Sequence, residues 1–395
     1  MKMYKQLSEL GNIVTGKTPS TANNELWGGT IPFITPTDIE GYDTYYQETT
    51  ERTISAYGVS RQQKTLLPPN TVCVTCIGST IGKPCITKSA SITNQQINSI
   101  IANKDNDYRY IYYLIREALP YFQLIGGGSG SGTPIISKNK FAKLKFPIES
   151  NLQKQRKIAS ILSAYDSLIE NNAKRIRLLE QMAENLYKEW FVCFRFPGYE
   201  HVEFVDGLPK GWKKVTLSEY ADIIMGQSPE SKYYNFNKKG LPFHQGVGSY
   251  GDFYLKDDIY ASEGKKIAKP NSIIFSVRAP VGRINITLNE IILGRGVAAM
   301  NAKDYTNGYL LWMLKDKFSK EDSIGNGSIF TSVTKDELYK QKIVIPSDIV
   351  LNRFEKIVNN IEGIIRGITK SNVSLTRQRD LLLPRLMSGK LEVKA

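Results

Sequence analysis

Apolar residues recur every third or fourth position between Gln153 and Trp190, an alternation that is typical of one face of a long helix. Neither proline nor glycine interrupts this segment. The strict seven-residue period predicts a coiled-coil seam, which needs a partner helix. At 1.5 Å per residue, the helix would be about 57 Å long. The predicted seam positions are Ile158, Leu162, Tyr165, Ile169, Asn172, Ile176, Leu179, Ala183, Leu186 and Trp190.

A second helical pattern near the end of the chain supplies the expected partner. Its seam positions are Ile357, Ile361, Ile364, Ile368, Ser371, Leu375 and Leu382. Ser371 corresponds to Asn172 of the first helix, and a polar seam residue fixes register while lowering stability. A helix that packed only on its own domain would not need so strict a period. We therefore expect two antiparallel helices that form a rod and hold two globular domains apart, although Gly363 and Gly367 weaken the second helix.

The segments outside these helices alternate short apolar runs with turn residues, which indicates strand-rich domains. Ile273–Val277 and Ile284–Ile286, for example, are separated by the turn segment Arg278–Gly282. One helix is expected in each globular part, over Tyr108–Leu119 and Tyr309–Phe318. The predicted fold class is therefore α+β (mixed α/β), with two strand-rich domains and two long antiparallel coiled-coil helices.

An internal repeat defines the domain organisation. Leu7–Pro19 matches Leu217–Pro229 in order and spacing. Shorter matches pair Pro32-Phe33 with Pro242-Phe243, Pro69-Asn70 with Pro270-Asn271, Gly82-Lys83 with Gly282-Arg283, Ile125–Ser129 with Ile324–Ser328, and Leu144–Pro147 with Ile343–Pro346. A repeat of about 200 residues is a duplicated domain with its connector. The predicted parts are a first globular domain over 1–150, a long helix over 151–195, a second globular domain over 196–349 and a long helix over 350–395.

Composition and charge narrow the function. The chain has 395 residues, of which 41% are hydrophobic, and this excludes a disordered or fibrous protein. Lys and Arg outnumber Asp and Glu by 52 to 38, giving a net charge of +14. Such an excess favours a polyanionic partner, either nucleic acid or an anionic membrane surface, and we favour nucleic acid over a charge that serves only solubility. No apolar stretch suits a signal peptide or a membrane span, so we expect a cytoplasmic protein with no membrane partner.

Several short motifs imitate catalytic or metal sites but lack an essential part. Cys73 and Cys76 have the spacing of zinc ligands, yet no second pair follows, and a buried strand explains them better. Gly78–Pro84 resembles a phosphate-binding loop but is one residue short and has no Ser or Thr after its lysine. Gly246–Gly251 has the glycine spacing of a dinucleotide site, but we expect a strand after it where a helix is required. The Asn-Pro-Pro-Tyr and Asp-Pro-Pro-Tyr segments of amino-methylating enzymes do not occur, and there are only two histidines. We therefore expect neither a catalytic residue nor a bound metal.

The duplicated segments, taken in order, match a known family. Each copy opens with a Gly-x-[ST]-Pro turn, Gly16–Pro19 and Gly226–Pro229, and closes with a strand that ends in proline. Other matching segments are Gln153–Ile158, Tyr187–Val192, Gly207–Trp212 and Leu383–Lys390. Over essentially its full length the sequence resembles the specificity subunit of type I restriction–modification systems. It departs at Leu351–Arg353, where a Glu-Gln pair is expected.

The resemblance implies a non-catalytic subunit that binds double-stranded DNA. Each globular copy would be a target recognition domain reading one half of a bipartite, asymmetric sequence, and the helices would set the spacer between the halves. Two methyltransferase subunits would dock on the helices and bind S-adenosylmethionine, and restriction subunits would bind ATP and magnesium. This chain itself would bind no cofactor. Two alternatives stay open: an orphan specificity subunit that serves modification only, and an autonomous DNA methyltransferase or nuclease.

Polar and basic residues in the turns of both copies are the candidate DNA contacts. In the major groove Arg and Lys read guanine and Asn and Gln read adenine, whereas phosphate contacts set position without reading sequence. The candidates are Lys17, Thr18, Lys83, Gln95 and Gln96 in the first domain, and Gln227, Ser228, His244, Gln245, Arg278, Arg283 and Arg295 in the second. Backbone amides of the glycine-rich segment Gly126–Gly132 are a further candidate for a phosphate contact.

Overall fold

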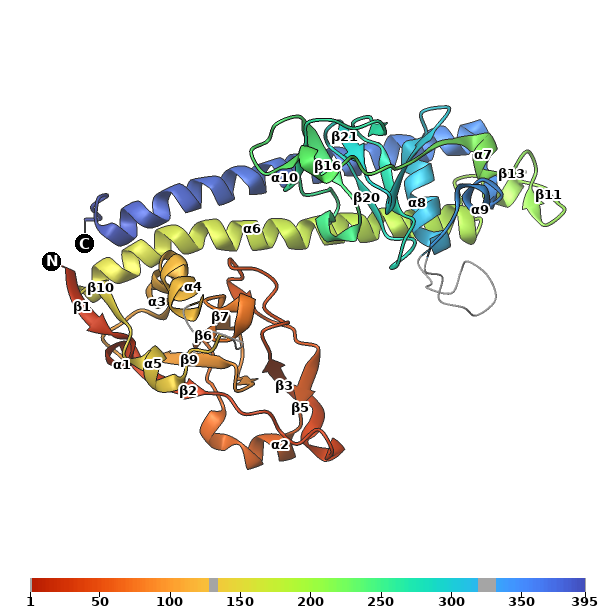
Figure 1. The fold of residues 1–395 in the computed structure, drawn as a ribbon. Helices are drawn as coiled ribbons and strands as arrows, with labels where there is room; N and C mark the ends of the chain where they lie inside the picture. The colour runs from red at the N-terminus through yellow and green to blue at the C-terminus, as the bar shows by residue number, and fades with distance from the viewer. Residues whose placement is uncertain (1, 128–133, 319–331, 395) are drawn as a thin grey trace. The chain divides into compact units, whose positions relative to one another are not determined.

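The computed structural model describes residues 2–127, 134–318 and 332–394 and divides the chain into two compact units (Figure 1). Unit 1 consists of Met1–Asn171 together with Ser371–Ala395, and unit 2 consists of Asn172–Lys370. Each unit contains a strand-rich globular part and portions of two long helices. None of the helices in the described ranges combines the length and apolarity that a membrane span requires.

The main sheet of unit 1 has five strands and is covered by helix α3 (Tyr108–Glu117). In spatial order its strands are β2 (Gly11–Thr15), β9 (Ile97–Ala102), β6 (Val72–Thr75), β7 (Pro84–Thr87) and β4 (Tyr46–Gln47). Val72 and Val74 pack in the cluster that includes α3, whereas Cys73 lies in the cluster on the other face. Because both faces are covered, β6 is apolar without alternation, and Cys73 is the small buried strand residue predicted from the sequence.

Two smaller assemblies complete the globular part of unit 1. A three-stranded sheet contains β5 (Arg52–Ile54), β3 (Trp27–Ile34) and β8 (Ile92–Thr93), and an antiparallel ribbon joins β1 (Lys2–Gln6) to β10 (Lys145–Glu149). The remaining helices are α1 (Leu7–Leu10), α2 (Ala56–Arg61), α4 (Leu119–Gly127) and α5 (Lys138–Ala142). The expectation of one helix per globular part was therefore too low. The side chains of Ser55 and Ser137 cap α2 and α5, so these short helices depend on local caps and leave no 3.6-residue pattern in the sequence.

Unit 2 follows the same plan. Its main sheet contains β14 (Ala221–Met225), β22 (Val297–Ala302), β19 (Ile273–Ser276) and β20 (Ile284–Ile286). The second sheet contains β15 (Tyr234–Asn235), β17 (Tyr260–Ala261), β16 (Leu241–His244), β21 (Ile291–Leu293) and β18 (Ile267–Ala268). Two ribbons pair β13 (Lys213–Thr216) with β23 (Lys342–Ile345) and β11 (Phe204–Val205) with β12 (Leu208–Pro209). Its shorter helices are α7 (Leu217–Tyr220), α8 (Asn307–Phe318) and α9 (Lys335–Tyr339).

Equivalent backbone conformations confirm the repeat. Phe33 pairs with Ile92 across the parallel strands β3 and β8, and Phe243 pairs with Ile292 across β16 and β21. The left-handed turn residues also correspond, with φ of 66° at Asn70 and 65° at Asn271, and 88° at Gly82 and 84° at Gly282. The aligned motifs thus build the same turns in both units.

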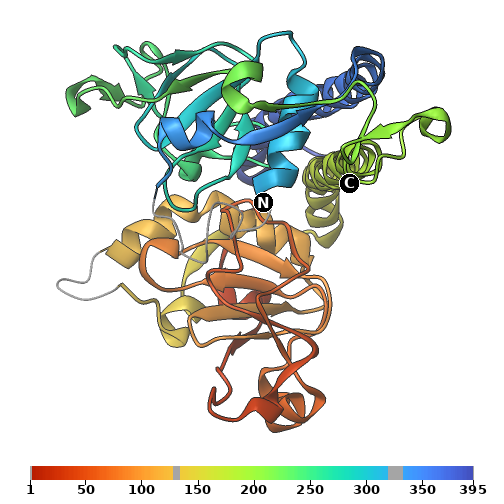
Figure 2. The same cartoon turned by 90° about the vertical axis from the view of Figure 1, so that its right-hand side faces the viewer.

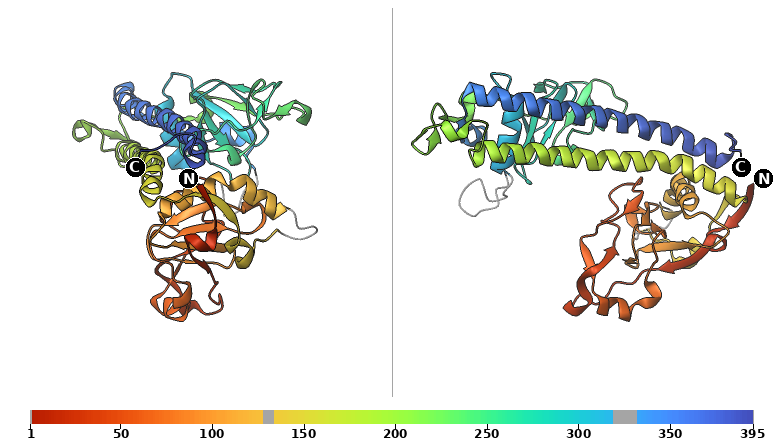
Figure 3. Two further views of the ribbon diagram at one scale, coloured as in Figure 1. Left: turned by 90° about the vertical axis from the view of Figure 1, so that its left-hand side faces the viewer. Right: turned by 180° about the vertical axis from the view of Figure 1, so that it is seen from behind.

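The long helices α6 (Leu152–Tyr187) and α10 (Asp348–Ser388) run antiparallel within each unit (Figures 1 and 3). In unit 1, Leu162 of α6 shares a buried cluster with Leu386 of α10. In unit 2 the opposite ends meet, and the rings of Trp190 and Phe354 lie 5.9 Å apart. Lys188–Val192 continues α6 as a turn of π-helix.

The predicted seam of α10 is wrong at three positions. Ile357 and Ile364 are 39% and 48% exposed, and Ser371 is also exposed. Their neighbours Val358 and Ile365 are fully buried instead. The cause is helix α8, which packs between the sheet and the long helices of unit 2 (Figure 2). A Cβ atom on its Gly308 would lie only 2.6 Å from Val358, so α10 faces α8 as well as its coiled-coil partner.

The other seam positions lie on inward faces. Buried positions are Ile158, Leu162, Asn172, Ile176, Ala183, Trp190, Ile361 and Ile368. Half-buried positions are Tyr165, Ile169, Leu179, Leu186, Leu375 and Leu382.

Polar contacts at equivalent positions hold the long helices to the globular part of each unit. In unit 1 the Gln155 side chain accepts a hydrogen bond from the backbone N–H of Asp107 at the start of α3, at 2.9 Å. In unit 2 the Glu355 carboxylate accepts one from Tyr309 in the first turn of α8, at 2.6 Å. A cation at the far end of each domain helix then reaches a carboxylate on a long helix. These pairs are Arg116 with Asp380 at 3.1 Å and Lys315 with Glu180 at 3.0 Å.

One buried charge network occurs in unit 1 without an equivalent at the aligned positions of unit 2. Arg379 of α10 is 2% exposed and donates to the buried carboxylate of Asp166 on α6. Tyr113 donates to the same carboxylate, and Arg116 lies 3.8 Å from it. Burial lowers the pKa of Arg379, but Asp166 and Asp380 raise it above its ordinary value. When the long helices are aligned on the equivalent contacts of Gln155 and Glu355, Leu179 stands where the other copy has Arg379.

Candidate nucleic-acid interface

Antiparallel pairing brings several loops to one end of the main sheet in each unit. In unit 1, Thr15 at the end of β2 pairs with Asn98, and Thr75 at the end of β6 pairs with Ile97. The loops after β2 and β6 therefore meet the loop that precedes β9. The corresponding pairs in unit 2 are Met225 with Ala298 and Ser276 with Val297.

These loops contain most of the candidate DNA contacts. We call residues 16–19, 76–83 and 94–96 the loop face of unit 1. The loop face of unit 2 comprises residues 226–229, 245–246, 277–283 and 294–296.

In the loop face of unit 1 the Gly-x-Thr-Pro turn lies against the loop before β9. Thr18 donates its hydroxyl hydrogen to Gln95 Oε1 at 2.6 Å. A Cβ atom on Gly16 would lie 2.1 Å from the backbone oxygen of Thr93, so only glycine permits this approach. Gln95 and Lys17 are exposed, and Gln96 is half-buried with its Oε1 accepting from Asn94 at 3.2 Å.

In the loop face of unit 2 the equivalent turn contacts the equivalent loop through a backbone group. Ser228 Oγ accepts a hydrogen bond from the backbone N–H of Arg295 at 3.1 Å. A Cβ atom on Gly226 would lie 2.0 Å from the Gly294 oxygen. Gln227, Gln245 and Arg295 are exposed there. The structure therefore brings together predicted residues that are far apart in the sequence.

The hairpins after β6 and β19 carry the remaining basic candidates. Arg278 and Arg283 are exposed in unit 2. The Lys83 ammonium in unit 1 instead donates to the backbone oxygens of Ile39 and Glu40, at 3.0 and 3.2 Å. Two of the three ammonium hydrogens of Lys83 thus have protein acceptors.

The structure does not support His244 as a DNA contact. It is 1% exposed, Nε2 lies 3.0 Å from Asp257 Oδ1, and Nδ1 lies 2.8 Å from Ser249 Oγ. Burial raises the pKa of Asp257, but hydrogen bonds from His244 and Asn289 hold it below its ordinary value. Both ring nitrogens are occupied, so His244 holds the loop after β16 in place.

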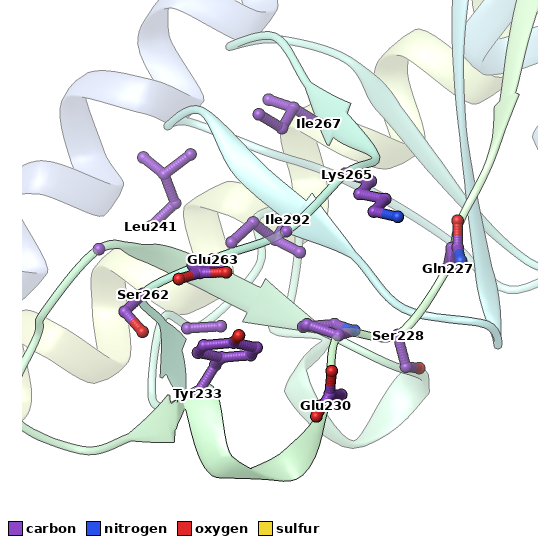
Figure 4. A pocket seen from close by; sticks show the side chains of 14 residues that line it. Gln227, Ser228, Glu230, Tyr233, Leu241, Ser262, Glu263, Lys265, Ile267 and Ile292 are labelled. Carbon is purple, nitrogen blue, oxygen red and sulfur yellow. The ribbon is translucent and has the colours of Figure 1, made fainter.

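A hollow of about 670 Å³ borders the loop face of unit 2 (Figure 4). Gln227 and Ser228 line one side of it, and Tyr233, Glu263 and Lys265 line the rest with several apolar side chains. Glu263 and the neighbouring Glu230 disfavour a phosphate in the hollow. Sequence reasoning missed the hollow, because the turn after β14 meets the segment 262–265 between β17 and β18 only in the folded unit.

The motifs that imitate catalytic sites have structural roles. Gly78–Thr80 is a 3₁₀ turn between β6 and β7, and Cys73 pairs directly with Cys85 across those strands. Gly246–Gly251 contains another 3₁₀ turn, Val247–Ser249, and no helix follows. The expected strand after it was also wrong, because that segment forms only isolated bridges. Within the described ranges no three His, Cys, Asp or Glu side chains are grouped to hold a metal. Of the segment Gly126–Gly132, residues 128–132 lie outside the described residues, and Gly126 belongs to α4.

Sequence reasoning also missed the charged network of unit 1. Arg379 follows Leu375 at seam spacing, but a charged residue does not fit a seam, so the prediction passed over it to Leu382. A basic residue at that spacing, together with the acidic Asp166 beside Tyr165, was the available signal.

The two units are thus copies of one strand-rich domain, and each presents a polar and basic loop face. The chain belongs to the family described as type I restriction modification DNA specificity domain, which matches residues 2–181 and 209–369. It is 28% identical over 405 residues to the type I restriction enzyme MjaIX specificity subunit of Methanocaldococcus jannaschii, covering 99% of this chain and 93% of that protein. The HindI specificity subunit of Haemophilus influenzae is 32% identical over 181 residues, 45% of this chain and 38% of that protein.

The fold is also similar to that of a solved structure. The crystal structure of a type I restriction-modification system S subunit from M. genitalium matches with a TM-score of 0.58 at 16% identity, covering 98% of this chain and 96% of that one.

Proposed function

We propose that this chain is the specificity subunit of a type I restriction–modification complex and reads a bipartite, asymmetric target in double-stranded DNA. Each unit would read one half of the target. The observation that carries the proposal is that one loop face occurs twice with different side chains. Unit 1 has Thr18 and Gln95 where unit 2 has Ser228 and Arg295. Two loop faces with the same backbone turns and different side chains suit two half-sites of different sequence.

Charge supplies the affinity in this proposal. Lysine and arginine bound to phosphates release counterions, which gives tight binding that falls steeply with salt. The exposed cations Lys17, Arg278 and Arg283 lie on the loop faces, and the net charge of +14 supports a polyanionic partner. The neutral amides Gln95, Gln227 and Gln245 contribute little to affinity and instead read base edges.

The long helices would set the spacing of the half-sites and dock two methyltransferase subunits. Exposed large apolar side chains support the docking, because such side chains mark partner surfaces when they gather on one element. On α6, Leu168, Leu178 and Met182 are 46%, 61% and 59% exposed, and on α10, Val373 and Leu381 are 67% and 56% exposed.

Catalysis and cofactors would belong to the partner subunits. We propose that the methyltransferase subunits bind S-adenosylmethionine and that restriction subunits bind ATP and magnesium. The incomplete phosphate-binding and dinucleotide motifs of this sequence support that division. Purified alone with S-adenosylmethionine or magnesium and DNA, the chain should neither methylate nor cleave, and turnover would establish the autonomous enzyme instead.

Mapping methylated bases across the genome, with and without this gene, tests the proposal. Deletion should remove methylation from one two-part motif and leave other motifs unchanged, and re-expression should restore it. A motif that persists after deletion, or the loss of a one-part motif, would contradict bipartite reading. Plasmid restriction in the same strains separates a complete system from a subunit that serves modification only.

A further inference from the structure

Gln95 and Arg295 occupy the same place in the two loop faces. The residue before each is anchored to the neighbouring strand: Asn94 N–H donates to Ile34 at 3.0 Å, and Gly294 N–H donates to His244 at 2.8 Å. The residue after each is anchored as well. Backbone N–H groups of Cys76 and Val277 donate to the oxygens of Gln96 and Gly296, at 2.8 and 2.9 Å. A single side chain therefore projects from a backbone that is fixed on both sides.

The turn after the first main strand touches this residue in both units. In unit 1 the Thr18 hydroxyl donates to the Gln95 side chain at 2.6 Å. In unit 2 the Ser228 hydroxyl accepts from the Arg295 backbone at 3.1 Å. The hydroxyl orients the amide in unit 1 and steadies the loop backbone in unit 2.

Both side chains keep hydrogen-bonding groups for a ligand. Gln95 is exposed, and its Nε2 has no acceptor among the described residues. Within the described ranges, the exposed Arg295 takes part in a side-chain contact only through its backbone N–H, so its guanidinium likewise has no carboxylate or carbonyl partner there. A glutamine amide pairs with adenine N6 and N7, and an arginine guanidinium pairs with guanine O6 and N7.

We infer that Gln95 reads an adenine in one half-site and that Arg295 reads a guanine at the structurally equivalent position of the other. The inference rests on the proposed function and names, for each unit, one residue and the base that it reads. A role in phosphate binding fits less well, because an uncharged amide stands at one of the two equivalent positions. Thr18 is a positioning residue, since it acts on DNA only through Gln95.

Reciprocal exchange of the two residues tests the inference. The full chain and its Gln95→Arg and Arg295→Gln variants are used to select duplexes from a randomised DNA library. Gln95→Arg should change one base of one half-site from adenine to guanine, and Arg295→Gln should change one base of the other from guanine to adenine. The preference at each position should shift by roughly 10- to 100-fold. Gln63→Arg and Arg353→Gln change the same residue types at exposed sites outside the loop faces and should leave both half-sites unchanged.

A second pair of variants tests the positioning role. Thr18→Val removes the hydroxyl that orients Gln95 and should weaken the adenine preference without moving it to another base. Thr18→Ser retains the hydroxyl and should restore the preference. Thermal unfolding of each variant separates a fold defect from a change in base reading.

The outcomes separate the inference from the proposed function. A wild-type chain that enriches a two-part sequence, with exchanges that alter neither base, overturns the inference alone. Exchanges that change only affinity and salt dependence overturn it too, because they identify phosphate contacts. A wild-type chain that enriches no sequence overturns the proposed function itself.

Discussion

Removing the Arg379 guanidinium should destabilise unit 1 selectively. Arg379→Met leaves the Asp166 carboxylate, 4% exposed, without its closest cation. Breaking a buried ion pair on one side generally costs about 3–5 kcal/mol. Tyr113 and Arg116 still face the carboxylate, so we expect the lower end, about 3 kcal/mol. That corresponds to roughly a hundredfold change in the unfolding equilibrium.

Hydrogen exchange followed by mass spectrometry localises the effect. In Arg379→Met, amides of α3 and of the last turns of α10 should exchange up to about a hundredfold faster, while those of α8 stay unchanged. Arg377→Met, an exposed change two residues away on the same helix, is the matched control. The double variant Asp166→Leu/Arg379→Met should recover much of the lost stability, because it leaves no unpaired buried charge. Equal exchange in Arg379→Met and Arg377→Met, or equal loss of protection in α8, would refute the reasoning.

Four further predictions concern recognition, pH and assembly. Arg283→Ala should weaken DNA binding and reduce the slope of log K against log salt by about 0.9, as for one lost phosphate contact; an unchanged slope with altered sequence preference would make it a base reader. His244→Ala should lower stability by about 1–3 kcal/mol in urea unfolding while the selected DNA sequence stays the same, and a changed half-site would restore it as a DNA contact. Burial raises the pKa of Glu362 to about 7, with Glu355 adding to the rise. The stability that its protonated form contributes is complete below pH 4.5 and is lost as pH rises through about 7. Glu362→Gln should therefore raise the free energy of unfolding by about 1–2 kcal/mol at pH 8 and flatten its dependence on pH between 4.5 and 7. Leu162→Asp with Ile176→Asp places two carboxylates in buried seam positions and should abolish assembly and methylation, so normal methylation by that variant would exclude a role for the seam.

The sequence alone predicted the features that depend on period and repetition. The duplication and the two long helices follow from spacing along the chain. The meeting of the Gly-x-[ST]-Pro turns with the other polar loops was not predicted, because it arises from the pairing of strands far apart in the sequence. The period did not identify the buried seam positions of α10 where two apolar residues are adjacent, at Ile357-Val358 and Ile364-Ile365. Either member of such a pair satisfies a seven-residue period, and only the packing of α8 on α10 decides which one is buried.

Residue type was a weaker guide within the candidate site. Exposed Gln95 and buried His244 both stood in predicted turns with polar neighbours. Their difference arises from Asp257 and Ser249, which occupy both nitrogens of the histidine ring. These partners come from a loop whose path no local pattern specifies, so burial of His244 could not be anticipated from its surroundings in the sequence.

The division of α10 between the two units has a consequence for synthesis on the ribosome. Unit 2 is one continuous stretch, whereas unit 1 needs Ser371–Ala395 to finish its core, including Leu383, Leu386 and Met387. Domains generally fold as their residues emerge, so the unit that begins the chain is the last to be completed. Until then the nascent polypeptide carries an unfinished apolar surface and an Asp166 carboxylate that lacks Arg379. A premature stop codon late in the gene would therefore damage the amino-terminal recognition unit and spare the one encoded beside it.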